Sequence, residues 1–118
     1  MAIFHVTTRA DWEAAEAVGS YRMSTKGATL DEVGFIHASS VEQLPRVANF
    51  LYSGTDEPLV VLELDDDGIR GSGIRIPWED GGDGELFPHI YGALDTRFVT
   101  AVHPAEFNAD GVVRYGSV

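Results

Sequence analysis

The run Pro58–Asp65, PLVVLELD, constrains the fold more than any other stretch of this sequence. Its apolar residues follow one another almost without interruption, whereas a strand with one solvated face would alternate apolar and polar residues. Such a run is typical of a central strand that is covered on both faces. The acidic run Asp65–Gly68 ends it. The sequence therefore predicts a sheet with this strand in its interior.

A first helix is predicted at about residues 9–18. Thr8 is a typical N-cap residue, and Asp11 stands three positions after it. Trp12, Ala15 and Val18 recur at the spacing of one helical face. Gly19 is the expected C-terminal stop, because glycine accepts the left-handed conformation that commonly ends a helix.

A second helix is predicted at about residues 41–52. Ser40 is its N-cap residue, and Gln43 completes the pattern of a capping box. Pro45 removes one backbone donor, but a donor in the first turn has no partner inside the helix. The helix is therefore expected to survive this proline.

Short strands are expected before, between and after these helices. The early alternation of strands and helices, followed by strands alone, predicts an α+β fold in a single domain, 1–118. Segment 21–33 has a mixed pattern of irregular structure or short strand, and the acidic, glycine-rich run 79–85 is predicted to be a flexible loop. The further strands are expected at 3–7, 35–38, 74–78, 87–91, 98–102 and 111–116.

Composition limits the possible partners. The net charge is −11 with a single lysine, so the chain lacks the clustered basic residues that an extended nucleic acid requires. A small phosphate ligand needs only backbone N–H groups and one or two arginines. No apolar run approaches the ~20 residues that cross a bilayer, and no secretory signal is evident. With no cysteine, a cytoplasmic location is the default expectation.

Three of the four histidines stand among apolar residues in expected strands: His5, His37 and His89. Two readings of this pattern are open. Each histidine is a core residue bonded to a neighbouring carbonyl, or all three point into one site. A neutral imidazole donates from one nitrogen and accepts at the other, so a half-buried ring can orient a hydroxyl. The repeated context modestly favours a shared site.

Other polar residues near these histidines are candidate ligand contacts. Ser39 and Ser40 stand where a helix begins, and free N–H groups there favour an anion. Glu85 borders the segment FPHIYG and is a candidate for the cleft of His89. The remaining hydroxyl candidates are Thr7, Thr8 and Tyr91.

Two residues outside this group, and the possibility of a metal site, carry weaker expectations. Glu63 falls in the central strand, so it is expected to pair or to lie at a functional surface. His103 is expected at an exposed strand end. A metal site is the rival use of the histidines, but they lie far apart and lack close-spaced ligand pairs, so no metal ligand is assigned.

Several segments together resemble the family known as domain of unknown function 952. The resemblance runs in the same order from about residue 3 to 107. It rests on IFHVTT with ADW, GFIHASS with VANFLY, PLVVLELD and FPHIYGAL.

That family in turn looks like a compact relative of the ADP-ribosyltransferase fold, a split β-sheet with two main helices. It is most similar to the catalytic lobe of RNA 2′-phosphotransferases. The resemblance implies NAD as the cofactor, a ribose contact for the first-strand histidine and later motifs beside the nicotinamide. Carried over residue by residue, it nominates His5 with Thr7, His37 with Ser39 and His89 with Tyr91.

The chain departs from those enzymes in two respects. Its 118 residues leave no room for their N-terminal RNA-binding lobe, and their late-strand glutamate has no equivalent in register. Either Glu85 or His89 takes the place of that glutamate. Three hypotheses follow: an NAD- or ADP-ribose-related enzyme using His37, His89 and Glu85; a non-catalytic module that binds a nucleotide-like metabolite; and a histidine-ligated metal enzyme.

Overall fold

Strand β6 is the centre of the main sheet in the computed structural model, which describes residues 2–107 and 113–115. The sheet is antiparallel throughout, in the order β1-β6-β10-β11. The central position predicted for run 58–65 is therefore confirmed. The four strands are β1 (Ala2–Thr8), β6 (Leu59–Asp65), β10 (Val99–Phe107) and β11 (Val113–Tyr115).

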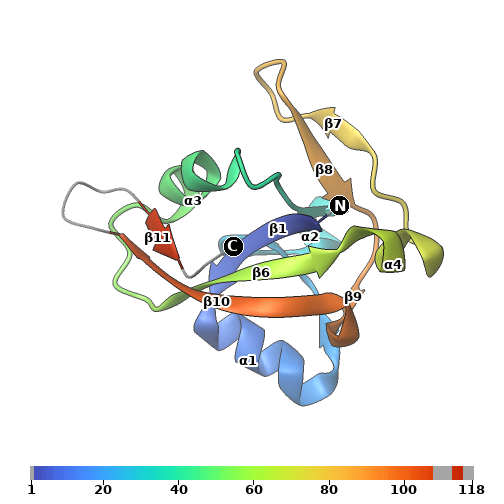
Figure 1. The fold of residues 1–118 in the computed structure, drawn as a ribbon, viewed down its shortest axis with the longest axis horizontal. Helices are drawn as coiled ribbons and strands as arrows, with labels where there is room; N and C mark the ends of the chain where they lie inside the picture. The colour runs from blue at the N-terminus through green and yellow to red at the C-terminus, as the bar shows by residue number, and fades with distance from the viewer. Residues whose placement is uncertain (1, 108–112, 116–118) are drawn as a thin grey trace.

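Two helices cover opposite faces of this sheet (Figure 1). On one face Trp12 packs in the same apolar cluster as Leu62 of β6. On the other, Tyr52 packs in a cluster with Val61. Successive residues of β6 thus pack into two different apolar clusters, as the alternation of side chains along a strand requires. The helices are α1 (Arg9–Val18) and α3 (Leu44–Tyr52).

Helix α1 has the predicted bounds and the predicted caps. The Asp11 N–H donates to Thr8 Oγ1 over 3.1 Å, which satisfies one of the free donors of the first turn. Gly19 ends the helix with a φ of 81°, in the left-handed region that glycine tolerates without strain.

Helix α3 begins at Leu44 and not at residue 41 as predicted. The predicted capping box is present: Gln43 N–H donates to Ser40 Oγ over 3.2 Å, and Ser40 N–H donates to Gln43 Oε1 over 3.0 Å. Pro45 has no N–H for the Val41 carbonyl, so continuous helical bonding is established only after the first turn. Residues 41–43 accordingly form turns.

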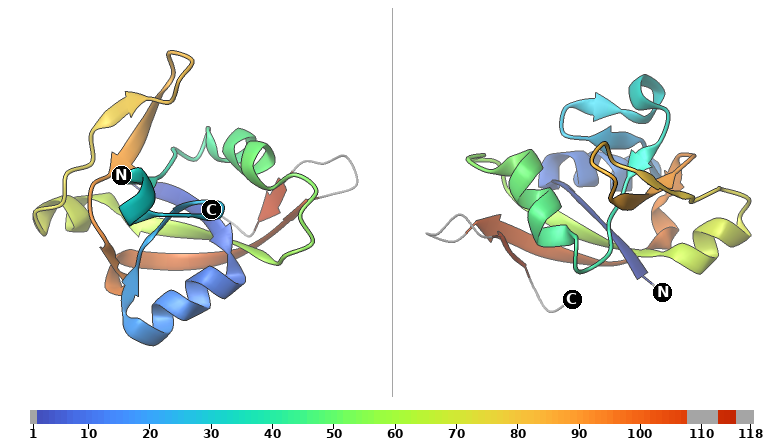
Figure 2. Two further views of the ribbon diagram at one scale, coloured as in Figure 1. Left: turned by 180° about the vertical axis from the view of Figure 1, so that it is seen from behind. Right: turned by 90° about the horizontal axis from the view of Figure 1, so that it is seen from above.

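A second sheet, in the order β5-β8-β7, is attached to the free edge of β1 (Figure 2). Phe4 and Ser39 exchange two backbone hydrogen bonds of 2.8 Å, which join β1 to the segment after β5. Ile36 and Ile90 are completely buried in the core on the α1 side. The strands are β5 (Ile36–His37), β7 (Trp78–Asp80) and β8 (Leu86–Ile90).

The remaining elements are short. Two of the helices, α2 and α4, were not expected from the sequence, which predicted irregular structure or a strand end in these regions. Thr29 and Glu32 form a complete capping box for α2. The elements are β2 (Ser20–Tyr21), β3 (Met23–Thr25), β4 (Ala28–Thr29), α2 (Leu30–Val33), α4 (Asp66–Gly71), β9 (Leu94–Asp95) and the 3₁₀ helix η1 (Thr96–Phe98).

The strand predicted at 74–78 lies further along the chain, since β7 begins at Trp78, the last residue of the predicted range. Arg75 and Pro77 still accept backbone hydrogen bonds from Tyr91 and His89, but in an irregular conformation. The predicted loop 79–85 is largely the end of the β7–β8 hairpin. There the Asp80 carboxylate accepts from two glycine N–H groups, at 2.7 and 3.0 Å, and closes the turn.

The expectation for His103 was wrong. This residue lies inside β10, opposite Val61, and its side chain is only 15% exposed. Its Nε2 lies 3.1 Å from Glu63 Oε1, so Glu63 pairs, which was one of its two expected outcomes. Among the described residues, no helix has the length and apolarity needed to cross a bilayer. The α+β class is confirmed.

Candidate functional site

A groove of about 620 Å³ lies between helix α3 and the outer face of the second sheet. We call it the histidine groove. The sheet contributes His37, Phe87 and His89, and α3 contributes a largely apolar wall. Of that wall, Phe50 is 87% exposed, so the groove is open to solvent along the helix. The α3 wall consists of Arg46, Val47, Asn49, Phe50 and Leu51.

Strand alternation places the two histidines of the groove. Ile36 and Ile90 point into the core, so their neighbours His37 and His89 point to the opposite face of the sheet. The two histidines are also directly paired across β5 and β8. Their ring centroids lie 5.4 Å apart, with the planes at 80°. The structure therefore brings together two of the three strand histidines in one wall.

Phe35 holds both rings in place. It stacks on the His89 ring with centroids 4.0 Å apart and planes at 18°. It also meets the His37 ring edge-on, at 4.8 Å. Aromatic pairs in these geometries stabilise each other beyond simple area burial. The imidazole rings are thus fixed before any ligand is present.

Glu79 is the polar partner of His89. Its Oε1 lies 2.8 Å from His89 Nδ1 and accepts a second hydrogen bond, of 2.6 Å, from the Tyr91 hydroxyl. These two bonds lower the pKa of the Glu79 carboxyl, because they favour its ionised form. His89 is 4% exposed, and its Nε2 is buried without a hydrogen-bond partner among the described residues.

His37 is half-buried, and its environment disfavours a positive charge. Burial lowers the pKa of His37, and the neighbouring His89 lowers it further. The ring is therefore neutral near pH 7. A neutral imidazole offers one donor and one acceptor to a ligand in the groove.

His5 lies behind this wall and not in the groove. Its Nδ1 is 2.5 Å from the His37 carbonyl oxygen, and its Nε2 is 2.6 Å from the Tyr21 hydroxyl. Burial lowers the pKa of His5 to about 4. Both ring nitrogens are therefore engaged with the protein, and His5 supports the backbone of β5. With Ser39 it borders a void of only about 10 Å³, too small for a nucleotide.

The candidate hydroxyls are mostly used by the fold. Thr7 and Ser39 are each 1% exposed. Thr8 caps α1, and Ser40 belongs to the cap before α3. The Tyr91 hydroxyl donates to Glu79. None of these five residues lines the groove.

Glu85 forms a bidentate ion pair at the rim of the groove. Arg46 donates to its two oxygens over 2.9 and 2.6 Å, and Gln43 Nε2 donates over 3.0 Å. The bonds from Arg46 and Gln43 lower the pKa of the Glu85 carboxyl. Arg46 borders the groove, so this pair connects the hairpin tip to α3 across its edge.

Sequence reasoning missed Glu79 and Phe35. Glu79 was assigned to a loop, yet β7 pairs it with Phe87, whose side chain lies in the groove wall. The available signal was the glycine-rich turn 81–84, which folds the residues before it back onto FPHIYG. Phe35 stands two positions before His37, so strand alternation places both side chains on the same face of the sheet.

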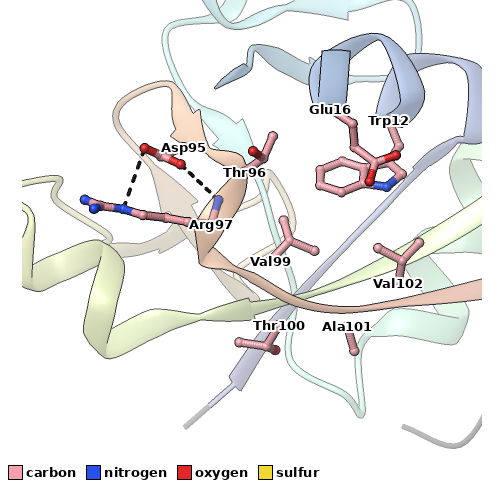
Figure 3. A pocket seen from close by; sticks show the side chains of 9 residues that line it. All are labelled: Trp12, Glu16, Asp95, Thr96, Arg97, Val99, Thr100, Ala101 and Val102. Carbon is pink, nitrogen blue, oxygen red and sulfur yellow. Dashed lines mark hydrogen bonds and ion pairs between the residues drawn. The ribbon is translucent and has the colours of Figure 1, made fainter. Parts of the chain in front are cut away.

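A second hollow, of about 520 Å³, lies between α1 and the start of β10 (Figure 3). Of its three charged residues, Asp95 and Arg97 bond to each other and are more than half exposed, and the third is Glu16. Figure 3 shows the Arg97 side chain reaching away from Trp12 and Glu16. No buried polar atom without a partner was found here among the described residues. The histidine groove is the stronger candidate site.

Metal ligation finds little support in the described part of the chain. No group of three or more His, Asp and Glu side chains is arranged there to hold a metal ion. Both nitrogens of His5 are already bonded. The three strand histidines consequently do not converge on one point.

The fold and site define a small α+β protein with an aromatic, histidine-lined groove beside a central antiparallel sheet. The chain belongs to the family described as protein of unknown function DUF952, whose model matches residues 6–102. No protein with a curated description matches the sequence.

Solved structures of the protein CC0527 from Caulobacter crescentus are similar to this chain over nearly its whole length. An X-ray structure has a TM-score of 0.80 and 32% identity, and the alignment covers 97% of this chain and 94% of that one. A solution NMR structure of the same protein has a TM-score of 0.75, with coverage of 94% and 90%. The family assignment rests on the match to the family model, and the solved structures show that the fold is shared with a protein of 32% identity.

Proposed function

We propose that the histidine groove binds a nucleotide-like ligand and that the chain is an enzyme of NAD or ADP-ribose chemistry. The observation that carries this proposal is the buried, unpartnered Nε2 of His89, in a ring that lines a groove of about 620 Å³. Ligand sites are typically clefts of ~300–1,000 Å³ with apolar walls and a few convergent polar groups. The groove has this size and composition.

The walls suit the parts of a nucleotide. Phe50 and Phe87 offer aromatic surface for a flat base, and base stacking on such side chains contributes about 1–3 kcal/mol per base. His37 and His89 offer ring nitrogens to ribose hydroxyls. Arg46 is the cation at the rim, although it already pairs with Glu85.

The geometry favours different roles from those that the ADP-ribosyltransferase resemblance implies. In the proposal, His37 and His89 contact the ligand, and His5 holds the backbone behind His37. Thr7, Thr8, Ser39 and Ser40 support the fold around the groove, and Tyr91 acts through Glu79. NAD and ADP-ribose remain the first ligands to test, because the resemblance nominates them.

A non-catalytic binding module is the second candidate function. It is favoured by the carboxylates near the groove, since Glu85 is clamped by Arg46 and Glu79 is bonded to His89 and Tyr91. Both oxygens of Glu85 are therefore engaged, and Glu79 uses its Oε1 for both of its bonds. Loss of one preorganised contact to a ribose hydroxyl in a transfer reaction costs roughly 3–4 kcal/mol of transition-state stabilisation.

Thermal unfolding with NAD, ADP-ribose, AMP and a 2′-phosphorylated oligonucleotide tests the binding proposal. We expect NAD or ADP-ribose to stabilise the protein by ~2.7 kcal/mol at one hundred times the dissociation constant. Replacing the exposed Phe50 with Ala is expected to weaken binding at least several-fold without impairing the fold, because its side chain buries little surface.

Val18→Ala is the matched control. Val18 is also an exposed apolar residue on a helix, at 76%, but it lies on α1, away from the groove. Equal binding by the wild type and both variants would show that the ligand binds outside the groove. Absence of stabilisation by every compound tested would contradict the proposed ligand class.

A further inference from the structure

The hydrogen bond between Glu79 and His89 has a defined donor and a defined acceptor. The Glu79 carboxylate has its pKa lowered by two hydrogen bonds, so it is ionised near neutral pH and can only accept. His89 Nδ1, 2.8 Å away, must then carry the proton of that hydrogen bond. In a neutral imidazole the other nitrogen, Nε2, is left as an acceptor.

No group of the described structure uses this acceptor. Nε2 is buried and lacks a hydrogen-bond partner, although buried polar atoms in folded proteins are nearly always paired. The His89 ring bonds to Glu79 through Nδ1, stacks on Phe35 and lies roughly perpendicular to the His37 ring. Arg75 lies farther out, over the Tyr91 ring. Because His89 is among the residues that line the groove, a molecule bound there is the candidate donor to Nε2.

We propose that Glu79 is a positioning residue that fixes His89 in its Nδ1–H form, and that the acceptor substrate of the site is a hydroxyl compound whose O–H donates to His89 Nε2. This inference rests on the proposed function and adds the class of the second substrate. The hydroxyl is that of water or of an alcohol such as a sugar, and the experiment below distinguishes them.

In the proposed step, the acceptor oxygen forms a bond to the anomeric carbon of the NAD ribose that bears nicotinamide. The proton of the acceptor moves to His89 Nε2. The bond from that carbon to the nicotinamide nitrogen breaks, and its electron pair stays with the nitrogen, so nicotinamide leaves uncharged. Glu79 then stabilises the imidazolium, a role that a carboxylate beside a catalytic histidine has in other enzymes.

Ring ¹⁵N NMR of the free protein at pH 7.5 tests the positioning role without any ligand. We expect His89 to show a protonated Nδ1 and an unprotonated Nε2 in the wild type. Glu79→Ala is expected to lose this preference, whereas Tyr91→Phe, which removes only the second bond to Glu79, is expected to keep it. A wild-type His89 with its proton on Nε2 overturns the inference.

Product analysis with NAD tests the acceptor class. Release of ADP-ribose in buffer alone identifies water, and a new ribosylated product upon adding glycerol or ribose identifies an alcohol. Nicotinamide exchange with no hydroxyl product overturns this part. If the NMR result holds but no nucleotide binds, the proposed function fails and the Glu79 assignment stands, so the two failures are distinguishable.

Discussion

Lowering the pH from 7 to 4 is expected to reduce the free energy of unfolding by about 3 kcal/mol through His5 alone. The pKa of His5 is about 4 in the folded protein, against 6.5 as the ordinary value. Between these values the unfolded chain binds a proton that the folded chain does not, so stability is lost as the pH falls. A shift of one pKa unit corresponds to ~1.4 kcal/mol.

The measurement is urea unfolding at intervals between pH 7 and pH 4, with His5→Gln as the comparison. Gln retains a polar amide but does not titrate, so the variant is expected to be less stable at pH 7 and to have a shallower pH dependence. His37 and the carboxyls whose pKa values are lowered titrate in both proteins and cancel in the difference. Parallel curves would show that His5 is not held neutral by burial.

Replacing His89 with Gln is expected to reduce turnover of NAD by about 10²–10⁴-fold, the usual contribution of a general base. The amide of Gln cannot take up a proton at neutral pH. Phe35 and Glu79 still provide the surroundings of the side chain, so the fold is expected to persist. Nicotinamide release at saturating NAD is the readout, with circular dichroism to confirm the fold.

His103→Gln is the matched control for this experiment. His103 also pairs with a glutamate, but on the main sheet between β6 and β10. It is expected to leave turnover unchanged. Wild-type turnover by His89→Gln would exclude His89 as the base. Tight NAD binding by the wild type without nicotinamide release would instead identify the non-catalytic module.

The elements that are specified locally were predictable from the sequence. The apolar run of β6 and the caps of α1 depend on residues within a few positions of one another, and the structure has them as expected. The start of α3 was not predicted correctly, because the capping box and Pro45 make competing local demands. Helix α2 was too short to give a periodic signal.

The candidate site was only partly predictable. His5, His37 and His89 have similar neighbours in sequence, so local context could not separate a core histidine from two groove histidines. What separates them is register: β5 pairs His37 with His89, while the His5 ring is used by the His37 carbonyl and by Tyr21. Glu79 depended on a hairpin whose turn was interpreted as a loop.

The proposed function requires that the ligand binds on the groove wall formed by His37 and His89. The most direct measurement is a titration of ¹⁵N-labelled protein with ADP-ribose, followed through the histidine ring resonances. We predict saturable shifts for His37 and His89 with a single dissociation constant, and no shift for His103. Binding that leaves the His37 and His89 rings unchanged, or no binding at all, would contradict the proposed function.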